Sequence, residues 1–169
     1  MPLNERARQF VVPYCDDLQI IDAAYAAIAA HIDKADRMKA LVHFSKRIVN
    51  VSDELRDLFT DTATFYMDLA RGEQRYQSNN DQELLSAFPA RELIRVWQNV
   101  DMAAWREFWS ESGGRIYDDR MIASAFDPVW GKLSILGRPY PPFQFRSGVD
   151  WREVGLDEWE KLRLPRKAK

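Results

Sequence analysis

Two adjacent carboxylates, Asp118 and Asp119, are the side chains of this sequence that come nearest to a catalytic pair. Arg115 and Arg120 flank them. Neighbouring acids hold different pKa values when one of them is buried, and such a pair can serve as general acid and general base. This pattern would suit a small carboxylate-dependent hydrolase. A surface turn that exposes both carboxylates explains the same residues, and we favour the turn.

Potential metal ligands are sparse along the chain. A zinc site takes about four nitrogen, sulfur or oxygen ligands, usually clustered in pairs. The sequence has one cysteine and two histidines, His31 and His43, which are well separated within a helical region. A zinc site is therefore not expected. Glu54, Asp57 and Asp61 follow a helical spacing that would suit magnesium or calcium, but a solvated acidic helix face is the favoured explanation.

Nucleophilic catalysis has equally little support. Cys15 lies beside Asp16 and Asp17, whose negative charges disfavour the reactive thiolate. The sequence contains neither a Gly-x-Ser-x-Gly elbow nor a phosphate-binding Gly-Lys-Ser/Thr loop. We therefore expect no enzymatic activity, no cofactor and no resident metal.

Binding chemistry is better represented, because arginines alternate with aromatic residues in the second half of the chain. Rings and guanidinium planes can stack on single-stranded bases or contact a protein partner. They can equally form a small core whose rings are covered by arginine side chains. The seven candidate binding residues are Arg115, Tyr117, Arg120, Arg138, Tyr140, Phe143 and Arg146.

The loop over 137–148 has three prolines, which restrict its backbone and suit it to a preorganised contact surface. A loop that cannot bury its backbone polar groups should lie at the surface. The expected arrangement has Trp130 or Trp151 packed beneath the loop, Tyr140 or Phe143 at least partly exposed, and Arg138 and Arg146 at the rim.

Two unlike halves must position these residues. Residues 14–71 contain neither glycine nor proline, so 1–75 is expected to be a helical hairpin or bundle. One or two helices are predicted over 17–49, with an alanine-rich face suited to self-association or to packing on the next helix. That helix is expected over 53–70, with Ser52 as its N-cap and Gly72 as the residue that ends it.

Residues 76–169 contain all six tryptophans and six of the seven glycines, and indicate a loop-rich region with short helices and a few short strands. The chain is therefore expected to be α+β and mostly helical, with the two regions packed as one domain. Several short elements are expected in the second region. They are a polar connection over 74–81, a short helix from Asp81 that stops before Pro89, a helix or strand over 92–96 of which we favour the strand, a helix capped by Asp101 with Trp105 and Trp109 buried on one face, a strand over 115–117, a short helix opened by Asp127-Pro128, and a last helix capped by Asp157.

Composition narrows the class of protein. The 169 residues are 46% hydrophobic and 30% charged, with a formal net charge of −2, a balance typical of globular domains. Such a charge gives no bulk argument for nucleic-acid binding. No stretch is apolar enough to span a membrane. The single Cys15 allows no internal disulfide, so a reducing cytoplasm is the expected location.

The second half resembles the C-terminal part of minor head, or head-morphogenesis, proteins of tailed bacteriophages and prophages. The matching blocks cover about 60 residues of the 169. They are Phe88-Pro-Ala-Arg-Glu-Leu-Ile-Arg-Val96, Trp105 and Trp109, Gly113-Gly-Arg-Ile-Tyr-Asp-Asp-Arg-Met-Ile-Ala123, Asp127-Pro-Val-Trp130, Leu133-Ser134, Gly137-Arg-Pro-Tyr-Pro-Pro-Phe143 and Phe145-Arg-Ser-Gly-Val149. Proteins of this kind are usually longer than this chain. At 145–149 the sequence also departs from the small polar residue before Ser-Gly-Met that the family leads us to expect.

The resemblance implies a non-enzymatic structural or interaction protein of phage origin, whose partner is a capsid or portal component. It transfers no catalytic residue, because such proteins are associated with head assembly rather than with a reaction. Self-association through the helical half is also compatible with the sequence. The alternatives are a single-stranded nucleic-acid binder, not favoured here, and the small hydrolase considered above.

Overall fold

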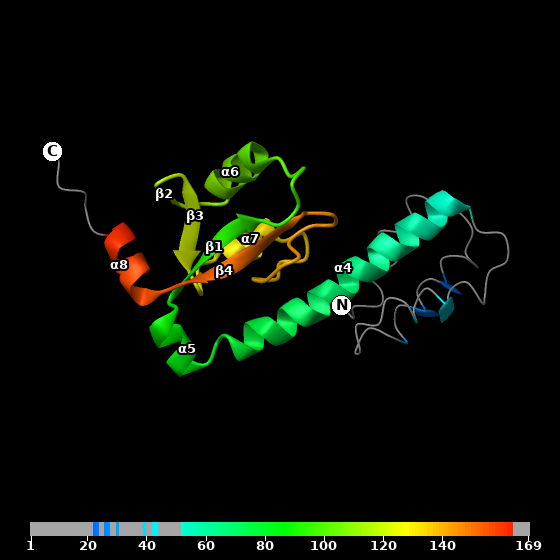
Figure 1. The fold of residues 1–169 in the computed structure, drawn as a ribbon, viewed down its shortest axis with the longest axis horizontal. Helices are drawn as coiled ribbons and strands as arrows, with labels where there is room; N and C mark the ends of the chain where they lie inside the picture. Colours follow the sequence, from blue (N-terminus) through cyan, green and yellow to red (C-terminus); the bar gives the residue numbers. More distant parts are fainter. Residues whose placement is uncertain are drawn as a thin grey trace. The chain divides into compact units, whose positions relative to one another are not determined.

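The computed structural model describes residues 52–163 and, upstream of them, Asp22, Ala23, Ala26, Ala27, Ala30, Lys39, Val42 and His43. The chain divides into two units, Met1–Arg71 and Gly72–Lys169. The elements in chain order are α4 (Asp53–Ser78), α5 (Gln82–Ala87), β1 (Ala90–Arg95), α6 (Met102–Glu111), β2 (Ile116–Tyr117), β3 (Arg120–Ser124), α7 (Val129–Leu133), β4 (Val149–Val154) and α8 (Leu156–Arg163) (Figure 1).

The helices predicted over 17–49 and their alanine-rich face lie mostly outside the described residues. The described positions there are helical, and Ala23 and Ala27 are buried. In α4, the first unit contributes a buried face that includes Phe59, Ala63 and Tyr66. The packing of the two regions into one domain stays a prediction.

The second unit is built on a four-stranded antiparallel sheet with the strand order β2-β3-β1-β4. Helices and sheet together confirm the α+β class. The strand expected over 92–96 is β1, which lies between β3 and β4 and is therefore buried along most of its length. Strands β3 and β4 were not predicted individually, because their pairing with β1 joins residues that lie far apart in the sequence.

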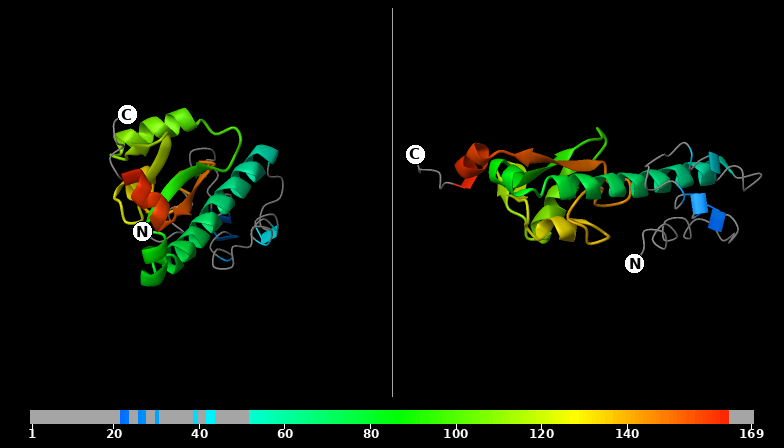
Figure 2. Two further views of the ribbon diagram at one scale, coloured as in Figure 1. Left: turned by 60° about the vertical axis from the view of Figure 1, so that its left-hand side comes forward. Right: turned by 90° about the horizontal axis from the view of Figure 1, so that it is seen from below.

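The two faces of this sheet are covered by different elements (Figure 2). Side chains alternate between the faces along a strand. On one face Ala90, Ile122 and Val154 form a cluster with Trp159 of α8. On the other face Trp151 packs edge-on to Trp130 of α7, at 6.3 Å between ring centroids. The central strand therefore has a packed layer on both sides.

The helix expected over 53–70 is longer than predicted, because α4 continues through Gly72 to Ser78. The prediction that Gly72 ends this helix, and that 74–81 is a polar connection, is wrong. A Cβ atom built on Gly72 would lie 2.0 Å from the carbonyl oxygen of Pro141. The glycine is therefore needed for close approach of the 137–148 loop to the helix, not for a turn of the backbone.

Most local signals predict the short elements correctly. Asp81 accepts a hydrogen bond from the amide of Glu83, and Asp101 accepts from the amides of Ala103 and Ala104. The α8 helix begins at Leu156, so Asp157 lies in its first turn rather than before it. The other confirmed predictions are the strand at Ile116–Tyr117, the Asp127 carboxylate that accepts from the Val129 amide at the start of α7, and the buried pair Trp105 and Trp109.

Candidate functional site

The acid pair Asp118–Asp119 forms the turn of the β2–β3 hairpin. Both residues have positive φ angles, of 50° and 65°, as in a type I′ turn. Aspartate tolerates this left-handed conformation better than most residues. The Asp119 side chain is 89% exposed, and Arg106 donates to the Asp119 carbonyl oxygen. The turn interpretation accounts for both acids.

The prediction that Tyr140 or Phe143 is partly exposed is wrong. Both rings are buried, with 3% and 0% of their surfaces exposed. Phe143 stacks on Trp130 with a centroid distance of 6.0 Å, as expected for a tryptophan beneath the loop. Tyr140 packs on Tyr76, near the end of α4. The loop is anchored by these rings because α4 and α7 close over them, so a partner cannot reach either ring.

The remaining predicted binding residues are dispersed over the second unit. Tyr117 packs edge-on to Trp159, and Arg120 is held in an ion-pair network. Arg115 is exposed and Arg138 is half-buried. Arg146 is exposed and, alone among the seven residues, lines the aromatic groove described below. The structure therefore does not gather the predicted set into one surface.

The network around Arg120 joins β1, β3, β4 and α8. Arg120 donates twice to the Glu92 carboxylate, at 2.8 and 2.7 Å, and pairs with Glu158 at 2.6 Å. Arg152 pairs with the same two acids. Burial by itself would raise the pKa of Glu92, but the hydrogen bonds and charges of Arg120 and Arg152 lower it below its usual value. The hydrogen bond from Arg120 also lowers the pKa of Glu158.

We expect this network to make the second unit acid-sensitive. A carboxylate whose pKa is lowered by folding contributes stability above its unfolded pKa, near 4.5, and this contribution is lost as the pH falls through the folded pKa. The melting temperature should therefore fall below about pH 4.5. Glu92→Gln should have a lower melting temperature than the parent at pH 7. Its melting temperature should also fall less than that of the parent on acidification. Glu160→Gln is the control, because Glu160 lies on the exposed side of α8, and its melting temperature should follow that of the parent at every pH. Parallel pH profiles for Glu92→Gln and the parent would contradict the expectation.

Arg91 is a buried cation that the sequence did not single out. Its side chain is 1% exposed and its guanidinium lies 3.4 Å from the centroid of the Trp151 ring. It donates to the carbonyl oxygen of Ala125 and to the side-chain oxygen of Asn80. Burial lowers the pKa of Arg91 to about 10. It therefore stays charged at neutral pH and ties the sheet to the segments around it.

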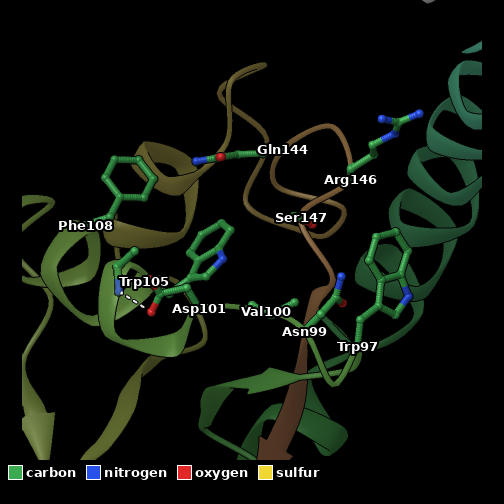
Figure 3. A pocket seen from close by; sticks show the side chains of 10 residues that line it. Trp97, Asn99, Val100, Asp101, Trp105, Phe108, Gln144, Arg146 and Ser147 are labelled. Atoms are coloured by element: carbon green, nitrogen blue, oxygen red, sulfur yellow. Dashed lines mark hydrogen bonds between the residues drawn. The ribbon is translucent and has the colours of Figure 1, made fainter.

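An aromatic groove of about 560 Å³ lies on the second unit, between the segment before α6 and the end of the 137–148 loop. Its volume lies within the range of small-molecule pockets. The groove residues are Trp97, Asn99, Val100, Asp101, Ala104, Trp105, Phe108, Gln144, Arg146 and Ser147 (Figure 3).

Trp97 stands at one side of the aromatic groove and is 49% exposed. A Cβ atom built on Gly148 would lie 2.9 Å from a carbon of the Trp97 ring and 2.4 Å from Val100. Gly148 also has a φ of +61°, which favours glycine, and its carbonyl oxygen accepts from the amides of Val96 and Trp97. An exposed ring is thus held in a fixed position by close contact with a glycine.

The α6 helix supplies the floor of the aromatic groove. The Asp101 carboxylate caps the helix, and this fixes the first turn from which Trp105 projects. Trp105 and Phe108 pack together at 5.9 Å between ring centroids. In Figure 3 the Trp97 and Trp105 rings both project toward the 144–147 segment. The sequence predicted Asp101 and Trp105 as structural residues but gave Trp97 no role. Trp97 belongs to no periodic pattern, so its exposure could not be predicted from the sequence.

Across the part of the chain that the structure describes, no three His, Cys, Asp or Glu side chains gather closely enough to hold a metal ion. No helix within those same residues is both long and apolar enough to cross a membrane. Comparison of the chain with protein-family models, with curated proteins and with solved structures found no match.

Proposed function

We propose that this chain is a non-enzymatic protein-interaction protein of phage or prophage origin, which contributes to capsid or portal assembly as minor head proteins do. The observation that carries the interaction role is Trp97, a half-exposed ring that the fold holds in place at the edge of the aromatic groove. A ring fixed before binding loses little conformational entropy when a partner covers it.

The composition of the aromatic groove supports a protein partner. Interface centres are enriched in tryptophan, phenylalanine and arginine, and the groove has Trp97, Trp105, Phe108 and Arg146. Val96, which precedes Trp97 in the sequence, is a further exposed apolar residue, at 56%. Tryptophan and arginine residues are frequent hot spots, which supply most of the binding energy of an interface.

The link to phage heads rests on the resemblance of the second half to minor head proteins. The matching blocks correspond to the β2–β3 hairpin, α7 and the 137–148 loop, together with β1 and α6. Of these elements, α6 and the 137–148 loop supply lining residues of the aromatic groove. The proposed location is accordingly the bacterial cytoplasm during assembly, or the virion.

The proposal is tested by asking whether portal or capsid genes lie beside the gene for this chain, and by measuring binding to the proteins that such genes encode. We expect one of them to bind, and Trp97→Ala to weaken its binding about tenfold or more, since interface tryptophans are frequent hot spots. Ile135→Ala is the matched control, because Ile135 is similarly exposed but does not line the aromatic groove. It should leave binding unchanged.

Several outcomes would contradict the proposal. Binding to neither head protein would remove the assembly role. Equal binding by Trp97→Ala and the parent would remove the aromatic groove as the contact surface. Metal-dependent hydrolysis that Asp118→Asn abolishes would instead favour the hydrolase.

A further inference from the structure

We infer that the aromatic groove binds an uncharged, apolar segment of a protein chain, in which a bulky side chain packs on Trp97 and Trp105 and the peptide backbone is held by the amide side chains at the rim. This inference rests on the proposed function and specifies the chemistry of the partner at the same site.

The charge of the aromatic groove is the first argument. Its lining contains one cation, Arg146, and one carboxylate, Asp101. The Asp101 carboxylate accepts hydrogen bonds from the backbone amides of Ala103 and Ala104, so it is already engaged in the helix cap. The Arg146 guanidinium lies over the neighbouring Phe145 ring and points away from Trp105 (Figure 3). The groove therefore presents little net charge to a ligand, which matches an uncharged partner.

Nucleic acid is the less suitable occupant on the same ground. Surfaces that bind single strands combine stacking rings with several cations that follow the phosphates. The aromatic groove has the rings but only one arginine at its rim. Of the other nearby basic residues, Arg106 pairs with the turn at Asp119. The aromatic rings of the groove, with few cations around them, therefore suit an apolar ligand better than a nucleic acid.

The polar groups of the aromatic groove are the second argument. Asn99 and Gln144 lie on opposite segments of the lining, and their side-chain amides contact no hydrogen-bonding partner in the described part of the chain. Each amide side chain can donate and accept at once, as a peptide group does. Ser147 adds a hydroxyl. Neutral donors and acceptors around an apolar floor suit a peptide backbone.

The test is fluorine NMR of the full chain labelled with 5-fluorotryptophan, with the Trp97 and Trp105 resonances assigned through Trp97→Phe and Trp105→Phe. The probes are the capped tripeptides Ac-Gly-Phe-Gly-NH2, Ac-Gly-Leu-Gly-NH2 and Ac-Gly-Asp-Gly-NH2, and a dT8 oligonucleotide. We expect the Phe and Leu peptides to shift the Trp97 and Trp105 resonances saturably and to leave the resonances of the other four tryptophans, which are buried, unmoved. The Asp peptide and dT8 should shift neither.

Two variants extend the test. The double variant Asn99→Ala/Gln144→Ala should weaken the Phe peptide severalfold while the Trp97 resonance of the unliganded protein keeps its position. A saturable shift by dT8 that disappears as salt is raised would overturn the inference in favour of nucleic acid. No shift with any peptide would overturn it as well, even if a head protein binds. Peptide shifts without binding to a head protein would leave the inference standing and remove the assembly role.

Discussion

Trp109→Ala is expected to lower the free energy of unfolding of the second unit by about 3–5 kcal/mol, the cost of emptying a large buried aromatic site. The ring is 0% exposed and packs edge-on to Trp130 at 5.1 Å between centroids. Its indole N–H donates to the carbonyl oxygen of Arg115 at 2.9 Å. Gly114 lies against the ring so closely that a Cβ atom there would be 2.3 Å from it. Truncation therefore removes packing and a hydrogen bond together.

Urea denaturation followed by near-UV circular dichroism measures this loss. Trp97→Ala is the matched control, because it removes the same atoms from a half-exposed position. It should cost much less than Trp109→Ala. Equal and small losses for both variants would mean that α6 is peripheral to the core of this unit.

Gly72→Ala is the second substitution with a large expected effect. In an ordinary helix interior this change stabilises by about 1 kcal/mol. Here the new methyl group would lie 2.0 Å from the carbonyl oxygen of Pro141, which is backbone and cannot rotate away. Either α4 or the 137–148 loop must shift, so we expect a net loss of about 1–3 kcal/mol.

Gly155→Ala is the control for this prediction, because nothing lies within 4 Å of a Cβ atom at that position. Its melting temperature should stay close to that of the parent. A more stable Gly72→Ala variant would show that the 137–148 loop does not pack on α4 in solution. Without a close neighbour, Gly72→Ala would stabilise α4; with Pro141 in contact it should destabilise the protein. The sign of the change therefore distinguishes the two cases.

Local chemistry made the short elements of the second unit predictable. A carboxylate at Asp81 or Asp101 satisfies helix amides only a few residues away, so the cap can be recognised without knowing the fold. The Asp118–Asp119 turn likewise depends on the left-handed preference of aspartate. The spacing of Trp105 and Trp109 placed both on one helix face, and both are buried.

The candidate site was predicted less well, because exposure is decided by distant segments. Tyr140 and Phe143 looked suited to a surface loop, yet Tyr76 of α4 and Trp130 of α7 cover them. Trp97 had no assigned role, yet its contact with Gly148 holds it exposed at the aromatic groove. Of the predicted binding residues, only Arg146 lines that groove.

The sequence by itself determined the helix caps Asp81 and Asp101, the hairpin turn, the buried face of α6 and the α+β class, since each depends on neighbouring residues or on periodicity. The tertiary structure alone decided the strand order β2-β3-β1-β4, the extension of α4 through Gly72, the burial of Arg91 and the place of each aromatic ring. The physical reason is that backbone preferences act over a few residues. Burial is set by whichever elements the long-range pairing of β1 with β4 brings together.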